Sequence, residues 1–302
     1  MLQHRKSQPR SLSGKVVAIT GAARGIGFAT ARALANQGAV VAVGDLDGDL
    51  AAQAASKLGG DAFGVSLDVT DNAAFTTFLD QVEGRLGPLD VLINNAGIMT
   101  AGPIEAEEEA KTAREIAINL HAVIHGTREA VLRMKPRRTG HIINISSAVG
   151  KIAGARVATY CATKFGVAGF SEAVALELHG TGVEISVVFP PQCNTEMTSG
   201  MKTMRGMPLV EPEDVAARIV ETLQRPRFEV PVPRTLGRSL WLSQALPFRA
   251  RAALARATKA DLLIRDMDAG RHAAYAERLE RMTAAAPERG ADLVSADAAG
   301  KE

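Results

Sequence analysis

Tyr160 and Lys164 are the residues whose types and spacing suggest chemistry most directly. They stand in the stretch YCATK (160–164), and residues four apart on a helix lie on the same face. A phenol has a pKa of about 10, too high for efficient proton transfer at neutral pH, and a neighbouring ammonium favours the phenolate and lowers that pKa. The pair predicts a general acid/base if a cofactor site and a second polar group converge on it. Packing of the tyrosine ring over a lysine stem is the alternative.

A second candidate site is the glycine-rich stretch TGAARGIG (20–27), which follows the strand-like run VVAIT (16–20) and opens a helical pattern. Gly21, Gly25 and Gly27 permit a tight turn, close approach of a pyrophosphate to the backbone, and close packing of the helix on a sheet. The free N–H groups and the dipole of the helix N-terminus favour an anion. This strand–turn–helix context predicts dinucleotide binding.

Asp45 ends the second strand-like run, VVAVGD (40–45), at a distance from the glycines that suits an adenosine ribose. A carboxylate there accepts hydrogen bonds from the ribose hydroxyls and repels a 2′-phosphate. The next residue is Leu46 rather than an arginine, so NAD is favoured over NADP. Arg24, in the glycine turn, argues the other way, because a basic side chain there could reach a 2′-phosphate. The alternative interpretation is that Asp45 is an exposed aspartate at a strand end and has no role in binding.

Short β-branched runs alternate with helical patterns through residues 13–233. The expected strands are 16–20, 40–45, 62–69, 89–97, 141–147, 184–190 and 228–232. The first expected helix begins in the glycine turn, and the others cover 50–59, 72–86, 107–135, 158–179 and 212–224. This alternation predicts an α/β fold, a doubly wound parallel sheet with helices on both faces, whose ligands bind beyond the carboxyl ends of the strands. Residues 1–12 are expected to form a flexible lead, 234–283 a helical extension and 284–302 a disordered tail.

The motifs TGAARGIG, NNAG (94–97) and YCATK, in this order, make the chain resemble the short-chain dehydrogenase/reductase family over roughly residues 13–233. The resemblance implies a Rossmann-type fold and transfer of a hydride between nicotinamide and an alcohol or carbonyl group. It implies that Ser147, rather than its competitor Ser146, is the catalytic serine. It implies the catalytic set Asn119, Ser147, Tyr160 and Lys164, and the cofactor-binding set Gly21, Arg24, Gly25, Ile26, Gly27, Asp45, Asp68, Val69, Asn95, Tyr160, Lys164 and Thr195.

Within these sets the resemblance implies particular roles. Asn119 helps to hold a water for proton relay, and Asp68 and Val69 border the adenine. Asn95 lies beside the cofactor ribose, and Thr195 contacts the nicotinamide carboxamide. Pro191 departs from the glycine that the family usually has after Pro190. Because proline fixes φ and removes an N–H, the contact implied for Thr195 depends on a backbone path that differs from the family pattern.

The segment between Pro191 and Pro212 is rich in methionine, at positions 197, 201, 204 and 207. The resemblance makes it the loop that covers the substrate. Flexible methionine side chains suit an adaptable apolar lid, so a hydrophobic alcohol or ketone is the expected substrate. Ordinary packing of a surface helix explains the same methionines.

The segment 225–259 carries eight arginines and lysines against one acid, Glu229, together with Trp241, Leu242, Leu246 and Phe248. A basic segment with apolar anchors can lie on an anionic membrane surface. It can equally pack over the active site or against a second subunit. Peripheral membrane contact through residues 234–259 is therefore one hypothesis for this part of the chain.

Composition limits which other partners and which compartment are expected. A net charge of +2 and dispersed arginines do not favour nucleic acid. Cys161 and Cys193 are the only cysteines, which favours a reducing cytoplasm over a disulfide framework, and no Cys/His cluster has the spacing of a metal site. The N-terminal stretch lacks the apolar segment of a secretory signal.

Two further expectations concern assembly and turnover. The resemblance implies a homodimer or homotetramer assembled through the helices at 107–135 and 158–179. A sensor or scaffold that binds NAD without turnover is the rival function. Intact Ser147, Tyr160 and Lys164 argue against it, because a protein that only binds has little physical need for them.

Overall fold

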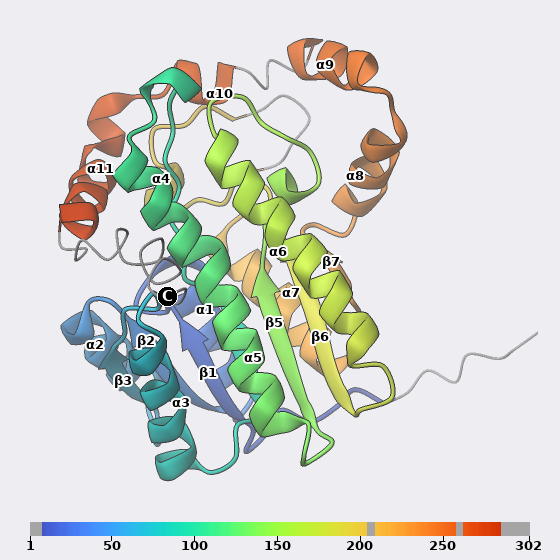
Figure 1. Cartoon of the computed structure of the whole chain (residues 1–302). Coiled ribbons are helices and arrows are strands. Elements are labelled where there is room, and N and C mark those ends of the chain that lie inside the picture. The colour runs from blue at the N-terminus through green and yellow to red at the C-terminus, as the bar shows by residue number, and fades with distance from the viewer. Residues whose placement is uncertain (1–7, 204–208, 258–261, 285–302) are drawn as a thin grey trace, which may run out of the picture.

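The computed structural model describes residues 8–203, 209–257 and 262–284. Seven parallel strands form one sheet in the order β3-β2-β1-β4-β5-β6-β7 (Figure 1). The strands are β1 Val16–Thr20, β2 Val40–Asp45, β3 Phe63–Ser66, β4 Val91–Asn94, β5 Gly140–Ile145, β6 Val183–Phe189 and β7 Glu229–Pro231. The strand order reverses between β1 and β4, which creates a crevice at their carboxyl ends. The predicted doubly wound α/β sheet is confirmed.

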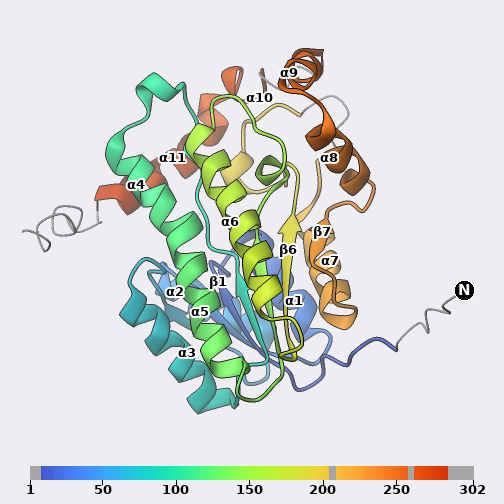
Figure 2. The ribbon, with the colours of Figure 1, turned by 45° about the vertical axis from the view of Figure 1, so that its right-hand side comes forward.

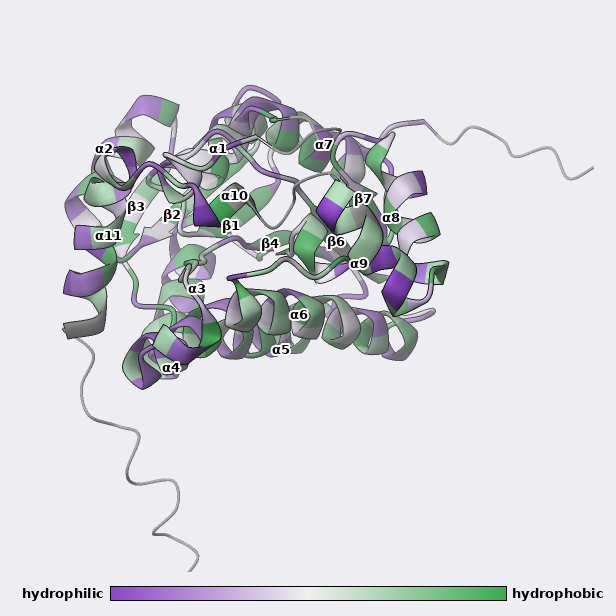
Figure 3. Ribbon diagram, turned by 90° about the horizontal axis from the view of Figure 1, so that it is seen from above, coloured by the Kyte–Doolittle hydropathy of each residue, from purple (hydrophilic) through white to green (hydrophobic). Residues whose placement is uncertain are grey.

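Helices cover both faces of this sheet (Figure 2 and Figure 3). One layer contains α1 (Gly25–Ala35), α2 (Gly48–Leu58) and α7 (Pro212–Gln224), and the other contains α3 (Asn72–Leu86), α5 (Ala122–Met134) and α6 (Ala158–Glu177). The alternation of side chains along a strand explains how one strand serves both layers. Val17 and Ile19 of β1 belong to the core under α1 and α7, whereas Val16 and Ala18 belong to the core under α3 and α5.

Several predicted elements differ from the observed ones. The strands expected over 62–69 and 89–97 are shorter. The Leu67 N–H still donates to Asp45 O of β2 at 2.8 Å, and the chain then turns at Asp68, whose side chain accepts the Thr70 N–H at 2.9 Å. After β4 the Asn95 N–H donates to a side chain, at 3.1 Å to Thr20 Oγ1. The single helix expected over 107–135 consists of α4 (Glu109–Ile116), a π-helical turn (Ala117–His121) and α5. Single π-turns within helices are frequent at functional sites.

The C-terminal extension is helical, as predicted. It contains α8 (Leu236–Ala245), α9 (Phe248–Ala257), α10 (Leu262–Arg265) and α11 (Ala269–Ala284). The extension crosses the end of the molecule at which the strands finish, and α11 lies against α4 (Figure 1 and Figure 2). No helix in the described ranges is long and apolar enough to cross a membrane. Most of the predicted flexible lead (1–7) and disordered tail (285–302), with Met204 and Met207 of the predicted lid, lie outside the described residues.

Candidate active site

The turn after β1 has the backbone that a phosphate site needs. Gly21 and Gly25 adopt positive φ values of 63° and 56°, which only glycine reaches without strain. A Cβ on Gly27 would lie 2.5 Å from Gly21 O, so this position admits no side chain. Arg24, the N-cap of α1, makes no side-chain capping hydrogen bond among the described residues. The first N–H groups of α1, which include that of Ile26, are therefore available to an anion.

Asp45 lies beside this turn, at the carboxyl end of β2. Its Oδ2 accepts the Ala23 N–H at 3.0 Å and its Oδ1 accepts the Asp47 N–H at 3.3 Å. Arg24 is paired with acids on either side, at 3.7 Å to Asp47 Oδ2 and 3.4 Å to Glu196 Oε2. A carboxylate next to the glycine turn, with the nearest arginine already paired, fits a ribose that carries free hydroxyls.

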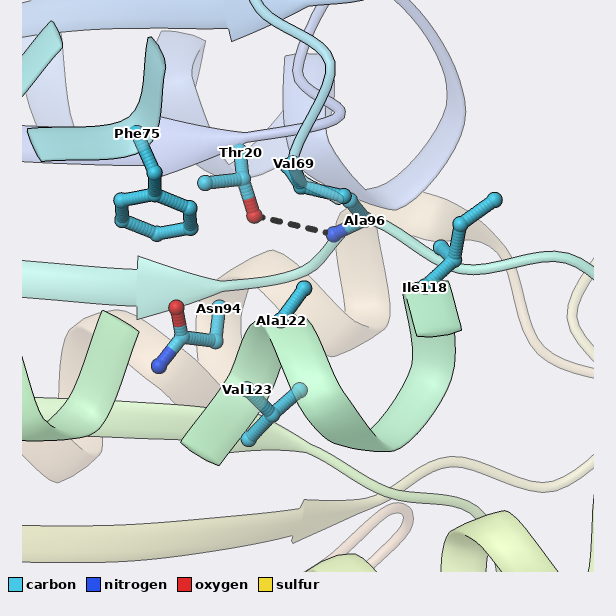
Figure 4. Close-up of a pocket in the computed structure, with 8 residues that line it drawn as sticks. All are labelled: Thr20, Val69, Phe75, Asn94, Ala96, Ile118, Ala122 and Val123. Atoms are coloured by element: carbon cyan, nitrogen blue, oxygen red, sulfur yellow. Dashed lines mark hydrogen bonds between the residues drawn. The ribbon is translucent and has the colours of Figure 1, made fainter. Parts of the chain in front are cut away.

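Asn95 joins β4 to the glycine turn. Its Nδ2 donates to Thr20 O at 2.9 Å and to Gly21 O at 2.8 Å. Thr20 Oγ1 in return accepts the N–H groups of Asn95 and Ala96, both at 3.1 Å, above a small recess that Val69 helps to line (Figure 4). The side chain of Asn95 thus holds the turn in its conformation.

Asp68 is engaged within the protein. Its carboxylate accepts hydrogen bonds from Thr70 N and Oγ1 at 2.9 and 2.7 Å, and from Arg114 Nη2 at 2.9 Å. Burial opposes ionisation of this carboxyl, but these hydrogen bonds and the arginine charge prevail and lower its pKa. Asp68 therefore anchors the segment that precedes Val69.

Ser147, Tyr160 and Lys164 come together beyond the carboxyl end of β5. Ser147 follows the strand, accepts the Val149 N–H at 3.3 Å and donates to Pro190 O at 3.4 Å, and it is close enough to Tyr160 to act on the pKa of that phenol. Tyr160 and Lys164 lie on the first two turns of α6, with Lys164 Nζ 5.5 Å from the centroid of the Tyr160 ring. Lys164 Nζ also donates to Ile145 O at 3.0 Å. The competitor Ser146 turns inward, where its hydroxyl donates to Lys164 O at 2.9 Å.

The pKa of Tyr160 corrects the sequence-based expectation. We expected the Lys164 ammonium to lower it, but burial raises it, because the phenolate would lose its hydration. The hydrogen bond from Ser147 acts in the lowering direction, and the charge of Glu115 in the raising direction. Burial also lowers the pKa of Lys164 to about 8, against a raising effect of Glu115.

Asn119 occupies the π-helical turn and is fully buried. Its Oδ1 accepts the Ile98 N–H at 2.9 Å, and its Nδ2 donates to Ile98 O at 2.8 Å and to Thr163 Oγ1 at 3.3 Å. Both amide hydrogens are therefore used. The side chain fixes the segment after β4 against α6. A water in this place would therefore have to contact backbone groups of the π-helical turn and not the Asn119 side chain.

Thr195 stands at the N-terminus of the short helix Glu196–Thr198, in a capping box with Thr198. Its Cγ2 lies 3.6 Å from the position that a Cβ on Gly25 would take, so Thr195 borders the glycine turn. Pro191 is buried, and the preceding Pro190 carbonyl accepts the Ala148 N–H at 2.8 Å. The two prolines thus join the end of β6 to the segment that carries Ser147.

Sequence reasoning missed Tyr275 of α11. This side chain is 2% exposed, and its hydroxyl accepts the Met99 N–H at 2.7 Å and donates to Met99 O at 3.2 Å. Three residues along α11, Arg278 pairs with Glu196, the acid that also pairs with Arg24. The signal lay in the spacing of His272, Tyr275 and Leu279, which places three buried side chains on one face of the helix.

An apolar wall lies beside the ring of Tyr160, which packs against it. Buried Met99, Val157 and Cys161 form a cluster there, against which Met197, Met201 and Ile264 pack. Ile264 belongs to the C-terminal extension, and Met99 is the residue that Tyr275 holds. The extension therefore contributes directly to the surroundings of the candidate site.

Comparison with known proteins gives a consistent result. A sequence model of the short chain dehydrogenase family matches residues 15–206. The chain is 37% identical over 193 residues to a 2,5-dichloro-2,5-cyclohexadiene-1,4-diol dehydrogenase of Sphingobium indicum, covering 63% of this chain and 77% of that one. It is 36% identical over 188 residues to a 3-oxoacyl-[acyl-carrier-protein] reductase of Haemophilus influenzae, covering 62% and 77%.

A third relative is a 3-alpha-(or 20-beta)-hydroxysteroid dehydrogenase of Mycobacterium bovis, 38% identical over 187 residues that cover 62% of this chain and 72% of that one. The fold is similar to that of a short chain dehydrogenase/reductase from Burkholderia phymatum in complex with NAD. The TM-score is 0.71 and the identity 23%, over 78% of this chain and 94% of that one. The chain therefore belongs to the short-chain dehydrogenase family of NAD(P)-dependent oxidoreductases.

Proposed function

We propose that the protein interconverts an alcohol and a carbonyl group on an apolar substrate, with NAD(H) as cofactor and Tyr160 as the general acid/base. The observation that carries the proposal is the meeting of Ser147, Tyr160 and Lys164 beyond β5. Lys164 Nζ lies 3.6 Å from the position that a Cβ on Gly97, the last residue of the NNAG motif, would take. This short distance between Lys164 and the end of the NNAG segment supports a site in which the three side chains act beside the cofactor.

The residues of the chain would supply everything except the hydride. Nicotinamide, when bound, supplies that hydride chemistry. Tyr160 donates a proton to the carbonyl oxygen in reduction and accepts it from the alcohol in oxidation. Ser147 hydrogen-bonds to the same oxygen, on which negative charge develops. Lys164 opposes, by its positive charge, the cost of forming the phenolate.

Asp45 supports NAD rather than NADP. Its carboxylate borders the glycine turn, and Arg24 is paired with acids. The Asp45→Asn variant can keep the hydrogen bond from Ala23 while it removes the charge. A hydrogen bond to a charged group contributes about 1.5–3 kcal/mol, so we expect the preference for NAD over NADP, measured as a ratio of kcat/KM, to fall by roughly 10- to 100-fold. An unchanged ratio would show that another residue sets the preference.

The wall around Tyr160 supports an apolar substrate. Met99, Val157, Met197, Met201 and Ile264 present aliphatic and thioether groups there, and methionine adapts to irregular shapes. We expect Met201→Ser to raise KM for bulky apolar substrates more than for small ones. Equal effects on a short and a long alkyl ketone would remove this part of the proposal.

The central test compares pairs of variants in a panel of alcohols and ketones, followed by absorbance of the reduced nicotinamide. Tyr160→Phe and Ser147→Ala should lose activity, whereas Ser146→Ala should retain the chemistry, because the Ser146 hydroxyl serves the Lys164 backbone. Activity of Tyr160→Phe equal to that of the wild type would contradict the role of Tyr160. Cofactor binding with no turnover of any substrate would instead favour a sensor or scaffold.

The outer surfaces of α5 and α6 support homo-oligomerisation. Ile124 and Leu132 of α5, and Phe165 and Leu176 of α6, are exposed although they are large and apolar. Burial of such a surface in a symmetric interface would stabilise a dimer or tetramer. Leu132→Glu combined with Leu176→Glu should lower the mass measured by light scattering, and an unchanged mass would place the interface elsewhere.

Peripheral membrane contact through the extension remains a second proposal. Trp241, Leu242 and Phe248 are 71%, 58% and 74% exposed, and no acidic residue occurs between Arg234 and Ala257. Apolar anchors among positive charges suit an anionic lipid surface. Flotation with anionic vesicles should fail for Trp241→Ser combined with Phe248→Ser. Equal flotation of this variant and the wild type, or none by either, would reject the idea.

A further inference from the structure

Glu115 is a buried acid that the mechanism above does not use. It lies in the last turn of α4, four residues before Asn119, and is 0% exposed. Its Oε2 accepts hydrogen bonds from the hydroxyl and, at 3.4 Å, the N–H of Thr100. Its Oε1 is buried and has no hydrogen-bond partner within the described ranges. A half-satisfied buried carboxyl is costly, and such groups cluster at functional sites.

The titratable groups around Glu115 belong to the candidate site. Thr100, which bonds Glu115, directly follows Met99, and the buried side chain of Met99 belongs to the cluster against which Tyr160 packs. The charge of Glu115 and those of Tyr160, Cys161 and Lys164 of α6, Tyr275 of α11 and Glu107 before α4 act on one another. The adjacent Arg114 does not pair with Glu115, because its guanidinium donates to Thr70 Oγ1 at 2.8 Å and to Asp68 Oδ2 at 2.9 Å. Lys164 is thus the cation whose charge lowers the pKa of Glu115.

Charge on Glu115 acts on both proton-transfer residues. A negative carboxylate raises the pKa of Tyr160 and that of Lys164. Burial raises the pKa of Glu115 itself to about 7, with the charge of Glu107 in the same direction and the Thr100 hydrogen bonds and the charge of Lys164 in the other. The group therefore changes its charge close to neutral pH.

We propose that Glu115 is a positioning residue for proton transfer, whose negative charge keeps Tyr160 a phenol and Lys164 an ammonium. The inference rests on the proposed role of Tyr160 as general acid/base. The phenol is the form that donates a proton to a carbonyl oxygen, whereas oxidation of an alcohol needs the phenolate to accept one. Ionised Glu115 therefore keeps Tyr160 in the form that reduction uses; in that step the Tyr160 O–H bond breaks and an O–H bond forms on the substrate oxygen, while the cofactor supplies the hydride.

The test is the pH dependence of kcat/KM for alcohol oxidation in wild type, Glu115→Gln and Glu109→Gln. Glu109 is the matched control, because it lies on the same helix and is exposed. We expect Glu115→Gln to shift the rising limb of the oxidation profile to lower pH by about one unit. At a given pH on that limb, oxidation is then roughly tenfold faster. Glu109→Gln should leave the limb in place. An unmoved limb in Glu115→Gln overturns the proposal.

Thermal unfolding supplies a readout that needs no cofactor. A carboxyl whose pKa is raised in the fold stabilises it at acidic pH, and this contribution disappears as pH rises through the folded pKa. The Tm of the wild type should therefore fall, relative to that of Glu115→Gln, as pH rises from about 5 to about 8. Parallel Tm curves would show that Glu115 keeps one charge state over this range, and would overturn the titration inferred for it near neutral pH.

Thr100→Val is the second variant, should Glu115→Gln not fold. It removes the hydroxyl that lowers the pKa of Glu115, so the carboxyl stays neutral to higher pH, and the pH range over which Tm falls should move to higher pH than in the wild type. A fall in Tm over the same pH range as in the wild type overturns the inference in this variant too. If Tyr160→Phe is inactive and the oxidation limb of Glu115→Gln stays in place, only the inference fails. If Tyr160→Phe is fully active, the proposed function fails first.

Discussion

Loss of one oxygen atom from Tyr275 should loosen the C-terminal helix from the candidate site. The Tyr275→Phe variant removes both hydrogen bonds to Met99, at 2.7 and 3.2 Å, while it keeps the ring. Met99 is buried, so its N–H is left without this partner. An orphaned buried donor costs about 1–3 kcal/mol.

The expected shift in Tm follows from the length of the chain. The entropy of unfolding is about 2.1 cal/mol/K per residue, and for 302 residues this sums to roughly 0.6 kcal/mol/K. A cost of about 1–3 kcal/mol then lowers Tm by roughly 2–5 °C. Because Met99 lies in the apolar wall around Tyr160, KM for a bulky apolar substrate should rise as well.

The assay combines calorimetry, limited trypsin digestion and steady-state kinetics. Arginines 271, 278 and 281 of α11 should be cut faster in Tyr275→Phe. The matched control is Tyr160→Phe, the same deletion in the only other tyrosine of the chain. It should abolish turnover and leave the digestion of α11 unchanged. A Tyr275→Phe variant with the Tm, digestion rate and KM of the wild type would refute the reasoning.

Three further predictions concern the glycine turn, an ion cluster and acid stability. Gly27→Ala places a Cβ 2.5 Å from Gly21 O; we expect about 1–3 kcal/mol of destabilisation and weaker NAD binding by fluorescence titration, and unaltered binding would contradict this. Glu196→Gln frees Arg24 and should lower KM for NADP relative to NAD; an unchanged ratio would show that Asp47 alone neutralises Arg24. Burial lowers the pKa of His141 to about 3, below its unfolded value of about 6.5, so the fold loses up to about 5 kcal/mol as pH falls through that window. His141→Gln should flatten this loss in urea titrations at successive pH values, and an equal loss in both proteins would contradict it.

Local signals explain why some boundaries were predicted closely. Asp71 caps α3 by accepting the N–H groups of Ala73 and Ala74, and Gly87 ends that helix with a φ of 94°. Pro212 begins α7 after a capping box. These residues act within a few positions of themselves, so the sequence displays their effect directly. The ends of β3 and β4 were overestimated because apolar patterning continues past the point at which backbone N–H groups bond to side chains, those of Asp68 and Thr20, instead of to a neighbouring strand.

The site shows the same division between local and distant causes. Ser147, Tyr160 and Lys164 were predicted as a group because short motifs bring them to the ends of β5 and α6, and their chemical roles stay predictions. Tyr275 was not anticipated, because its partner Met99 is 176 residues away and no motif records that pairing. The pKa of Tyr160 was expected in the wrong direction, since a neighbouring charge is visible in a sequence but the burial of a hydroxyl is not.

The pairing of Met99 with Tyr275 also bears on the order in which the molecule is completed during synthesis. The ribosome delivers the glycine turn, the β5 end and both first turns of α6 long before residue 275 appears. The contacts that hold Met99 in the apolar cluster beside Tyr160 therefore form last, when α11 has been synthesised. We expect a chain that stops before residue 275 to keep the strands of its sheet but to lack this support of the candidate site.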